Sequence, residues 1–314
     1  MKEYEQISSF FRLLEVVEGV YAAIARKGVG AMGNAGFIDL GNETIVFDTF
    51  FTIPAAVDLR KVAEQYTGHK VTYVINSHYH FDHVLGNQIF HDVPIISTKE
   101  ARNAMEREMD FSDIDRHRTE LEQYIKELEQ EIDKQNDPLI IKSLTNQMQD
   151  VKMFYQIIPQ IHPTLPTVTF ENNLELFGLK GNIELHSYGG GHTNSDVFLY
   201  LPEKRLAFMG DLVSNHSHPW VGAGDIQKWK SILEKVSQLD IEIIIPGHGM
   251  PGTMENVHLT YQYLKDIERI GNELAPYQNE QPLKPIEMPN TYKEWESPHV
   301  FQNNIRAFLQ SMNL

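Results

Sequence analysis

The 314-residue chain contains no cysteine, and this absence excludes several chemistries at once. Without thiols there are no disulfides, no cysteine-ligated zinc or iron–sulfur clusters and no thiol nucleophile. Basic residues are also few, because 27 lysines and arginines stand against 43 acidic residues, for a formal net charge of −16. Since nucleic-acid binding depends on neutralising phosphates, this charge argues against a nucleic-acid partner.

Long apolar runs are missing as well. No window approaches the roughly 18 apolar residues of a membrane span, and Arg12 and Glu15 interrupt the apolar run near the amino end. A signal peptide requires an uninterrupted apolar stretch. We therefore expect a cytoplasmic protein without membrane attachment.

The residues that are present indicate a globular α/β protein, with 41% hydrophobic and 22% charged residues. We expect a single domain over 1–314. Two β-rich stretches with helices at corresponding places predict two sheets packed face to face with helices outside. Single strands are expected at 20–25, 35–40, 44–49, 71–76, 93–97 and 241–246, and several strands within 165–210. Helices are expected at 54–66, 225–239 and 254–274.

Residues 99–160 differ from the rest, because they are polar, nearly free of glycine and strongly helical in pattern. Apolar residues recur at steps of three and four on both sides of a break at Asn136-Asp137-Pro138. This predicts a helical-hairpin insertion whose two apolar stripes need a partner surface. It could be a structural addition, a lid over the active site or an arm that forms a homodimer. A C-terminal helical extension is expected over 254–314.

The segment after the 71–76 strand carries four metal-binding side chains within six residues: His78, His80, Asp82 and His83. Side chains two apart in an extended segment point the same way, so His78 and His80 can converge on one cation. Asp82 and His83 could turn toward a second cation if the chain bends there. A lone histidine is more often structural, but this density of ligands indicates a metal site.

Three later segments add ligand types at strand ends. Each places a histidine or an aspartate beside glycines, whose conformational freedom suits a pre-organised metal site. Taken singly, each has an ordinary alternative, since a turn histidine or a helix-capping aspartate needs no metal. Together with the first motif they make a set of five histidines and two aspartates, completed by His192 in GGGHTNSD, Asp211 in FMGD and His248 in PGHG.

The ordered motifs HxHxDH, GGGHT, GD and PGHG resemble those of the metallo-β-lactamase-fold hydrolase superfamily. The resemblance covers roughly 18–252, with the insertion as a departure. It implies an αββα sandwich of two mixed sheets flanked by helices, with its site at one sheet edge. By residue matching, the first metal would be held by His78, His80 and His192, and the second by Asp82, His83 and His248, with Asp211 bridging.

Five imidazoles and two carboxylates suit two zinc ions, with iron or manganese as alternatives. Two metals can hold a bridging hydroxide and polarise the bond under attack, so no side-chain nucleophile is needed. The resemblance makes Asp82 both a ligand and the residue that moves a proton. True β-lactamases of the family usually carry Cys or Ser where Asp211 stands, so the chain looks like glyoxalase II thioesterases, lactonases or phosphodiesterases instead. We expect a hydrolase of small-molecule, ester-like bonds.

Residues near the motifs are candidates for substrate binding. His216, His218 and Trp220 follow Asp211 by a few residues and could bind substrate or protonate a leaving group. The alternative is a loop that Trp220 packs against the following helix. Tyr188, just before the glycine turn, is a further candidate of the same kind.

Two rival interpretations come from other enzyme classes. Gly28, Gly30 and Gly33 match GxGxxG with Asp48 at a strand end, as in dinucleotide-binding proteins. That motif must open a helix, whereas a β-hairpin pattern follows here, so a loop at the rim of the site is expected. The second rival is a mononuclear iron oxygenase that resembles persulfide dioxygenases on the same scaffold.

Overall fold

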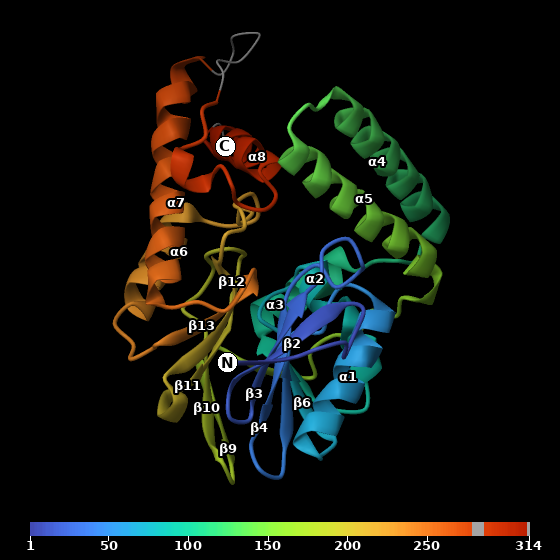
Figure 1. The fold of residues 1–314 in the computed structure, drawn as a ribbon, viewed down its shortest axis with the longest axis vertical. Helices are drawn as coiled ribbons and strands as arrows, with labels where there is room; N and C mark the ends of the chain where they lie inside the picture. Colours follow the sequence, from blue (N-terminus) through green and yellow to red (C-terminus); the bar gives the residue numbers. More distant parts are fainter. Residues whose placement is uncertain (278–285, 313–314) are drawn as a thin grey trace.

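Two β-sheets pack face to face, and helices cover their outer faces (Figure 1). This computed structural model describes residues 1–277 and 286–312. Both sheets are mixed, because each combines antiparallel strands with at least one parallel pair. The predicted αββα sandwich is therefore confirmed.

The first sheet has eight strands that neighbour one another in chain order. Pairing is antiparallel from β1 to β5 and parallel from β5 to β8, so the carboxyl ends of β5, β6 and β7 meet at one edge. The strands are β1 (Lys2–Tyr4), β2 (Phe11–Val17), β3 (Val20–Ala25), β4 (Ala35–Asp39), β5 (Thr44–Phe47), β6 (Val71–Ile75), β7 (Ile95–Thr98) and β8 (Val168–Phe170).

The second sheet has five strands in the order β13-β12-β11-β10-β9, and β12 and β13 pair in parallel. Its strands are β9 (Asn173–Gly178), β10 (Gly181–His186), β11 (Phe198–Leu201), β12 (Leu206–Ser214) and β13 (Ile243–His248). Apolar side chains of the two inner faces form one core, in which the Phe47 and Phe208 rings lie 5.4 Å apart. Burying such side chains contributes about 1.5–3 kcal/mol each.

Local signals set the helix boundaries. Pro54 lies in the first turn of α1, and Gly68 ends it with φ +76°, a conformation that glycine adopts without strain. The α-helices are α1 (Ile53–Thr67), α2 (Phe81–Val84), α3 (Lys99–Glu108), α4 (Ile114–Lys134), α5 (Pro138–Ile157), α6 (Ile226–Val236), α7 (Met254–Leu274) and α8 (His299–Ser311). Short 3₁₀ helices occupy Leu85–Phe90, Ile158–Gln160, Pro202–Lys204, Ala275–Tyr277 and Asn290–Tyr292. In the part of the chain that the structure describes, no helix has the length and apolar content to cross a membrane.

The outer helices cover opposite faces of the sandwich. Leu59 and Val62 of α1 pack against the eight-stranded sheet, while Trp229 of α6 and Tyr263 of α7 pack against the five-stranded sheet. Phe301 of α8 packs into the same apolar cluster as Trp229 and Tyr263. The predicted C-terminal helical extension over 254–314 lies partly outside the described residues.

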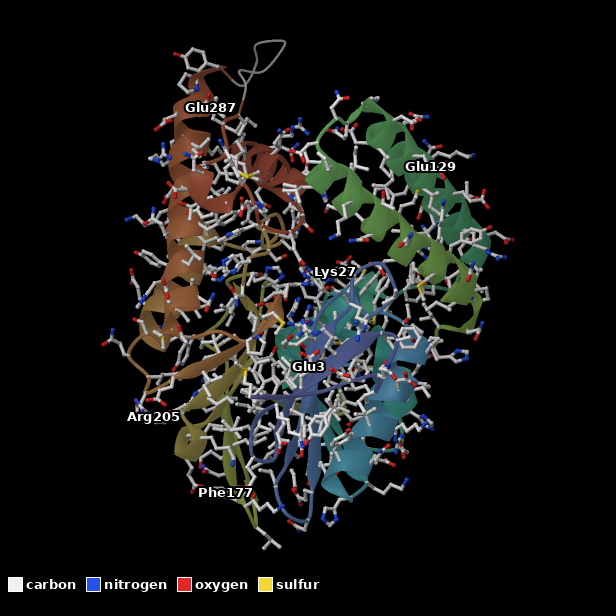
Figure 2. All side chains as sticks on the ribbon, viewed as in Figure 1. Glu3, Lys27, Glu129, Phe177, Arg205 and Glu287 are labelled. Atoms are coloured by element: carbon white, nitrogen blue, oxygen red, sulfur yellow. The ribbon has the colours of Figure 1, made fainter. Side chains whose placement is uncertain are left out.

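Helices α4 and α5 form the predicted helical hairpin. Leu128, Leu144 and Val151 are buried between its two arms, and Phe154 at its base packs on Phe51 with ring centroids 5.0 Å apart. The hairpin rises at the same end of the molecule as α7 and α8 (Figure 1). Figure 2 shows Glu129 of the hairpin at the opposite end from Phe177 of β9.

Candidate metal centre

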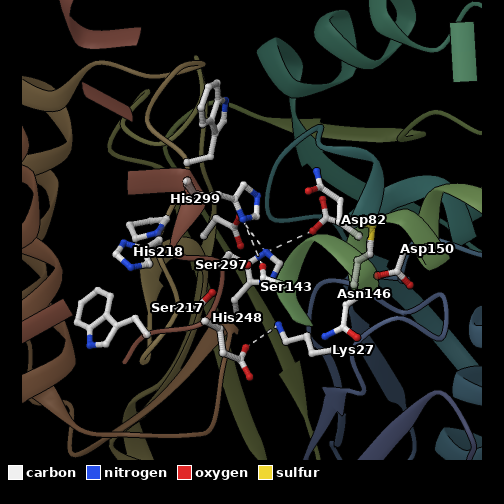
Figure 3. Close-up of a pocket in the computed structure, with 18 of the residues that line it drawn as sticks. Lys27, Asp82, Ser143, Asn146, Asp150, Ser217, His218, His248, Ser297 and His299 are labelled. Atoms are coloured by element: carbon white, nitrogen blue, oxygen red, sulfur yellow. Dashed lines mark hydrogen bonds and ion pairs between the residues drawn. The ribbon is translucent and has the colours of Figure 1, made fainter. Parts of the chain in front are cut away.

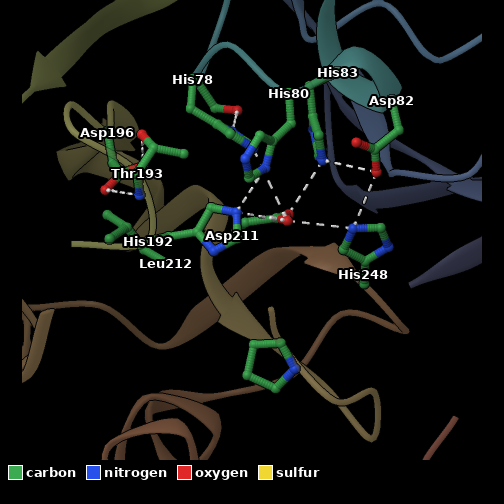
Figure 4. A network of polar contacts seen from close by, with 12 residues as sticks. His78, His80, Asp82, His83, His192, Thr193, Asp196, Asp211, Leu212 and His248 are labelled. Carbon is green, nitrogen blue, oxygen red and sulfur yellow. Dashed lines mark hydrogen bonds and ion pairs between the residues drawn. The ribbon is translucent and has the colours of Figure 1, made fainter. Parts of the chain in front are cut away.

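All seven predicted ligand residues lie at or near strand ends of the two sheets. Figure 4 shows them converging on one region. Their positions are His78 and His80 after β6, Asp82 and His83 in α2, His192 after β10, Asp211 in β12 and His248 at the end of β13.

The first ligand group consists of His78, His80, His192 and Asp211, whose candidate ligand atoms all lie within 4.8 Å of one another. His192 Nε2 lies 3.0 Å from His80 Nδ1 and 3.3 Å from Asp211 Oδ2. His78 Nε2 is 4.0 Å from the same carboxylate oxygen. Four donor atoms at these separations can surround a single cation.

The second ligand group consists of Asp82, His83 and His248, again with candidate ligand atoms within 4.8 Å of one another. Asp82 Oδ2 lies 3.4 Å from His83 Nε2 and 3.3 Å from His248 Nε2. The chain bends into α2 directly after His80, which turns Asp82 and His83 toward this group.

Asp211 lies between the two groups. Its Oδ2 is 3.3 Å from His192 Nε2 of the first group and 3.4 Å from His248 Nε2 of the second. Its Oδ1 is 3.2 Å from His83 Nε2. One carboxylate therefore contacts both ligand groups, as a bridging ligand must.

Space and donor chemistry both fit a pair of metal ions. His78 Nε2 is buried and has no hydrogen-bond partner, as expected of a nitrogen reserved for a metal. Glycine keeps the backbone close to the cluster at two positions, because a Cβ at Gly247 would lie 1.9 Å from Asp211 Oδ1 and one at Gly33 2.7 Å from His83 Nε2. Imidazole and carboxylate ligands suit zinc, iron or manganese.

Burial keeps the histidines of the first group neutral. Desolvation lowers the pKa of His78 well below its usual value, lowers the pKa of His80, and lowers the pKa of His192 to about 3. Neutral imidazole is the form that binds a metal. The first group is therefore ready to bind a cation at neutral pH.

Carboxylates reverse this effect in the second group. Although burial opposes the charged form, Asp211 and Asp82 raise the pKa of His248 to about 9 and hold the pKa of His83 well above its usual value. The same histidines outweigh burial at Asp82 and hold its pKa well below the usual value. A cation that binds here must displace protons from the imidazoles.

Asp48, which follows β5, lies beside the ligand cluster, a position that the sequence analysis did not assign to it. Its Oδ2 lies 2.8 Å from His83 Nδ1, and its carboxylate accepts hydrogen bonds from the backbone N–H and hydroxyl of Ser77, at 2.8 and 2.7 Å. Ser77 Oγ in turn lies 2.9 Å from His78 Nδ1. One buried carboxylate thus orients a histidine of each group. The only sequence signal for it is that an aspartate ends a strand-like run, which is also typical of turn residues.

A second buried carboxylate holds the glycine turn that carries His192. Asp196 accepts hydrogen bonds from the backbone N–H groups of Gly191 and Thr193, at 2.7 and 3.1 Å. Burial raises the pKa of Asp196 to about 6. The Trp229 ring supports His192 from the other side, with ring centroids 5.2 Å apart.

A cavity of about 830 Å³ opens onto the cluster (Figure 3). Helix α5 and residues 294–300 form its outer walls, and Ser143 Oγ of α5 lies 3.4 Å from His299 Nδ1 of α8. An ion pair of 3.0 Å joins Lys27 to Glu296 at the cavity wall. The hairpin therefore borders the site.

Of the four candidate substrate residues, two line the cavity and two do not. Trp220 and His218 line the cavity, and Trp220 keeps 41% of its surface exposed. Within the described chain, neither His216 nor Tyr188 is part of the cavity wall. His216 is exposed with its Nδ1 2.7 Å from Asn215 Oδ1, and the Tyr188 ring packs against Phe198.

His218 is held by both ring nitrogens. Its Nδ1 lies 3.0 Å from the Tyr263 hydroxyl and its Nε2 lies 3.1 Å from the Tyr292 carbonyl oxygen. The imidazole is buried among Trp295, Phe301 and these tyrosines. These contacts fasten the loop after β12 to the C-terminal segment.

We expect His218 to make the protein less stable in acid. Burial lowers the pKa of His218 to about 4, below the usual 6.5, so the unfolded chain binds a proton that the folded chain does not. The contribution of neutral His218 to the free energy of unfolding is complete above pH 6.5. It is lost as the pH falls toward 4, and the loss is on the order of 3 kcal/mol. Denaturant unfolding across this range should show a smaller pH dependence in His218→Gln than in the wild type. Exposed His69→Gln is the control, and an unchanged dependence in His218→Gln would contradict the assignment.

Comparisons with known proteins agree with this geometry. A family model described as the metallo-beta-lactamase superfamily matches residues 28–248. The curated protein "Metallo-beta-lactamase type 2" of Bacteroides fragilis is 26% identical over 85 residues, which are 26% of this chain and 34% of that protein. The match thus spans about a third of that relative's length.

Solved structures show the same fold at low sequence identity. A metallo-beta-lactamase from Pontibacter korlensis has a TM-score of 0.60 at 15% identity, covering 82% of this chain and 99% of that one. The DIM-1 metallo-beta-lactamase has a TM-score of 0.58 at 17% identity, covering 82% and 98%. At these identities the likeness concerns the fold alone.

Proposed function

Since the chain belongs to the metallo-beta-lactamase superfamily, we propose that it is a hydrolase that uses two metal ions to cleave an ester-like bond. The family together with the His/Asp cluster indicates a metal-dependent hydrolase. The observation that carries the finer proposal is Asp211, whose Oδ2 lies 3.3 Å from His192 Nε2 and 3.4 Å from His248 Nε2. A carboxylate between two ligand groups supports two ions rather than one.

Each ligand residue has a role in this proposal. The first ion would be held by His78, His80 and His192, the second by Asp82, His83 and His248, and both by Asp211. Zinc is the proposed ion, with iron and manganese as alternatives. When bound, the ions would supply an activated water as nucleophile and polarise the bond under attack.

Asp82 is the proposed proton carrier. It lines the cavity, and its pKa is held well below the usual value because His83 and His248 outweigh the effect of burial. The carboxylate is therefore ionised at neutral pH, which is the form that can accept a proton from a group in the cavity. It can return that proton to a leaving group, as a general acid–base must.

The cavity supports a small-molecule substrate with an apolar portion. Its volume of about 830 Å³ falls in the range of small-molecule sites. Tyr79 and Phe81 lie on one wall, and Trp220 and Trp295 come from other segments. Thioesters, lactones and phosphodiesters are the proposed substrate classes. A cytoplasmic location, the lack of a nucleic-acid partner and dimerisation through the hairpin stay predictions.

We expect the purified, fully loaded protein to hold two metal ions per chain. The expectation follows from the two ligand groups and the carboxylate between them. Elemental analysis after loading with zinc, manganese or iron measures the stoichiometry. A hydrolysis screen of each form with thioesters, lactones, phosphodiesters, sulfate esters and β-lactams then identifies the substrate class.

The same preparations distinguish the proposed two-metal hydrolase from the mononuclear iron oxygenase. A ceiling of one iron per chain, with oxygen uptake on a persulfide and no hydrolysis, would support the mononuclear oxygenase instead. His248→Ala is the informative variant, because it removes a ligand of the second group while leaving His78, His80 and His192 in place. It should reduce the stoichiometry from two ions to one.

A further inference from the structure

The loop between β3 and β4 connects the helical hairpin to the second ligand group. At one end, residues 28–30 lie against α5, and at the other end Gly33 and Asn34 lie against the metal ligands. This loop contains the GxGxxG pattern of the sequence.

Four residues on one face of α5 form the contact with this loop. A Cβ at Gly28 would lie 2.7 Å from Gln149 Oε1 and 3.1 Å from Asn146 Oδ1, and one at Gly30 would lie 2.9 Å from Met153 Cε. The backbone N–H of Gly30 donates a hydrogen bond of 2.7 Å to Asp150 Oδ1. The loop is therefore seated on the hairpin and held there by Asp150.

Asp150 is an unusual residue for a contact that only fills space. It is 4% exposed, and burial raises its pKa to about 6, while the backbone N–H groups of Gly30 and Gly28 favour the charged form. An unpaired buried carboxylate is costly, and an apolar side chain would pack at lower cost. The carboxylate has a specific use here, which is to accept hydrogen bonds from the loop.

The other end of the loop touches the second ligand group. A Cβ at Gly33 would lie 2.7 Å from His83 Nε2 and 3.0 Å from the Asp82 carbonyl oxygen. The Asn34 backbone N–H donates to the Gly247 carbonyl at 2.7 Å, and its Nδ2 donates to the Gly249 carbonyl at 2.8 Å. Asn34 thus holds the residues on both sides of His248.

We propose that Asp150 is a positioning residue for the second metal ion. By holding Gly30 it fixes the loop that packs on His83 and holds the His248 turn, so the inserted hairpin sets the affinity of this ion. The inference rests on the proposed function, because it treats Asp82, His83 and His248 as a metal site. It assigns the insertion a role beyond forming the cavity wall.

The test is the affinity of each of the two ions, measured by zinc titration in competition with a chromophoric chelator. Asp150→Leu keeps the branching of the side chain at Cγ and removes the acceptor, so it should weaken the second ion about 10–100-fold and leave the first within about twofold. Asp150→Asn retains an oxygen for the Gly30 N–H and should restore most of the affinity. Asp133→Leu, at an exposed position of the same hairpin, is the control. Asp150→Ala, which also removes the acceptor, replaces Asp150→Leu if that variant does not fold.

A cobalt titration adds a spectroscopic readout, because the absorption of the second cobalt ion should change in Asp150→Leu while that of the first does not. Gly33→Ala perturbs the other end of the loop and should weaken the second ion without any change in the hairpin. Equal affinities in Asp150→Leu and the wild type, or equal weakening of both ions, would overturn the inference. A wild type that binds a single ion would instead contradict the proposed function.

Discussion

Replacing Asp82 with asparagine should lower the rate of hydrolysis by about 10²–10⁴-fold, the usual contribution of general acid–base catalysis. Asp82 lines the cavity and has a pKa held well below its usual value because His83 and His248 outweigh burial, so it is an ionised proton acceptor at neutral pH. The amide keeps the shape of the side chain but cannot accept a proton. It also weakens the second ligand group, while the three histidines of the first group stay in place. The measurement is kcat on the substrate that the screen identifies.

Metal content must be measured on the same samples, because loss of the second ion alone would also reduce the rate. Asp137→Asn is the matched control, since it makes the same carboxylate-to-amide change at the N-cap of α5, where asparagine caps equally well. Near-normal turnover of Asp82→Asn with both ions bound would refute the proposed role. Proton transfer would then have to be assigned to another group at the site.

Asp48→Asn should weaken the second ion by about 10–100-fold, the usual effect of losing a partner that orients a metal ligand. Asp48 Oδ2 lies 2.8 Å from His83 Nδ1 and accepts the proton of that nitrogen, which leaves Nε2 free to bind a metal. An amide N–H facing Nδ1 would favour the opposite tautomer, with the proton on Nε2. The side chain would keep its size and the hydrogen bond from the Ser77 backbone N–H to Oδ1, yet His83 would present a proton to the ion.

Zinc affinities of Asp48→Asn and of Asp39→Asn separate this effect from the loss of a carboxylate in general. Asp39 belongs to the same sheet and forms a surface ion pair with Lys180, which contributes about 0–1 kcal/mol. The Asp39 variant should bind both ions as the wild type does. If Asp48→Asn also binds both normally, the hydrogen bond does not control the tautomer of His83.

The ligand cluster could be predicted from the sequence because its residues lie in short motifs whose spacing is local. Asp48 could not be singled out in the same way. Its partners are set by the parallel pairing of β5 with β6, which brings positions 48 and 77 together. A single aspartate at a strand end has no local pattern that distinguishes it from a turn residue.

Strands β1 and β2 were missed for a different physical reason. Leu13 and Leu14 are adjacent in β2, yet both are buried, Leu13 against the α1 side of the sheet and Leu14 in the core between the sheets. A strand covered on both faces loses the alternation of apolar and polar residues that identifies strands. The sequence pattern alone therefore does not distinguish β2 from an interrupted apolar run.

The local sequence also does not predict which of His216 and His218 lines the cavity. The Glu296 backbone pairs with both residues, donating to the His216 carbonyl at 2.9 Å and accepting from the His218 N–H at 3.1 Å. This pairing with a segment about 80 residues away fixes the loop, and side-chain packing then buries His218 and leaves His216 exposed. Only the tertiary fold decides which of the two histidines meets the cavity.

Each ligand group draws on both sheets, since His78, His80, Asp82 and His83 follow a strand of the first sheet while His192, Asp211 and His248 belong to the second. Neither half of the chain contains a complete cation site. Under the proposed function, metal binding would therefore cross-link the two halves, and it would stabilise the folded chain by about 2.7 kcal/mol for each ion present at 100 times its dissociation constant. A chain in which the two sheets have separated would release its ions, so retained metal reports that the halves are docked.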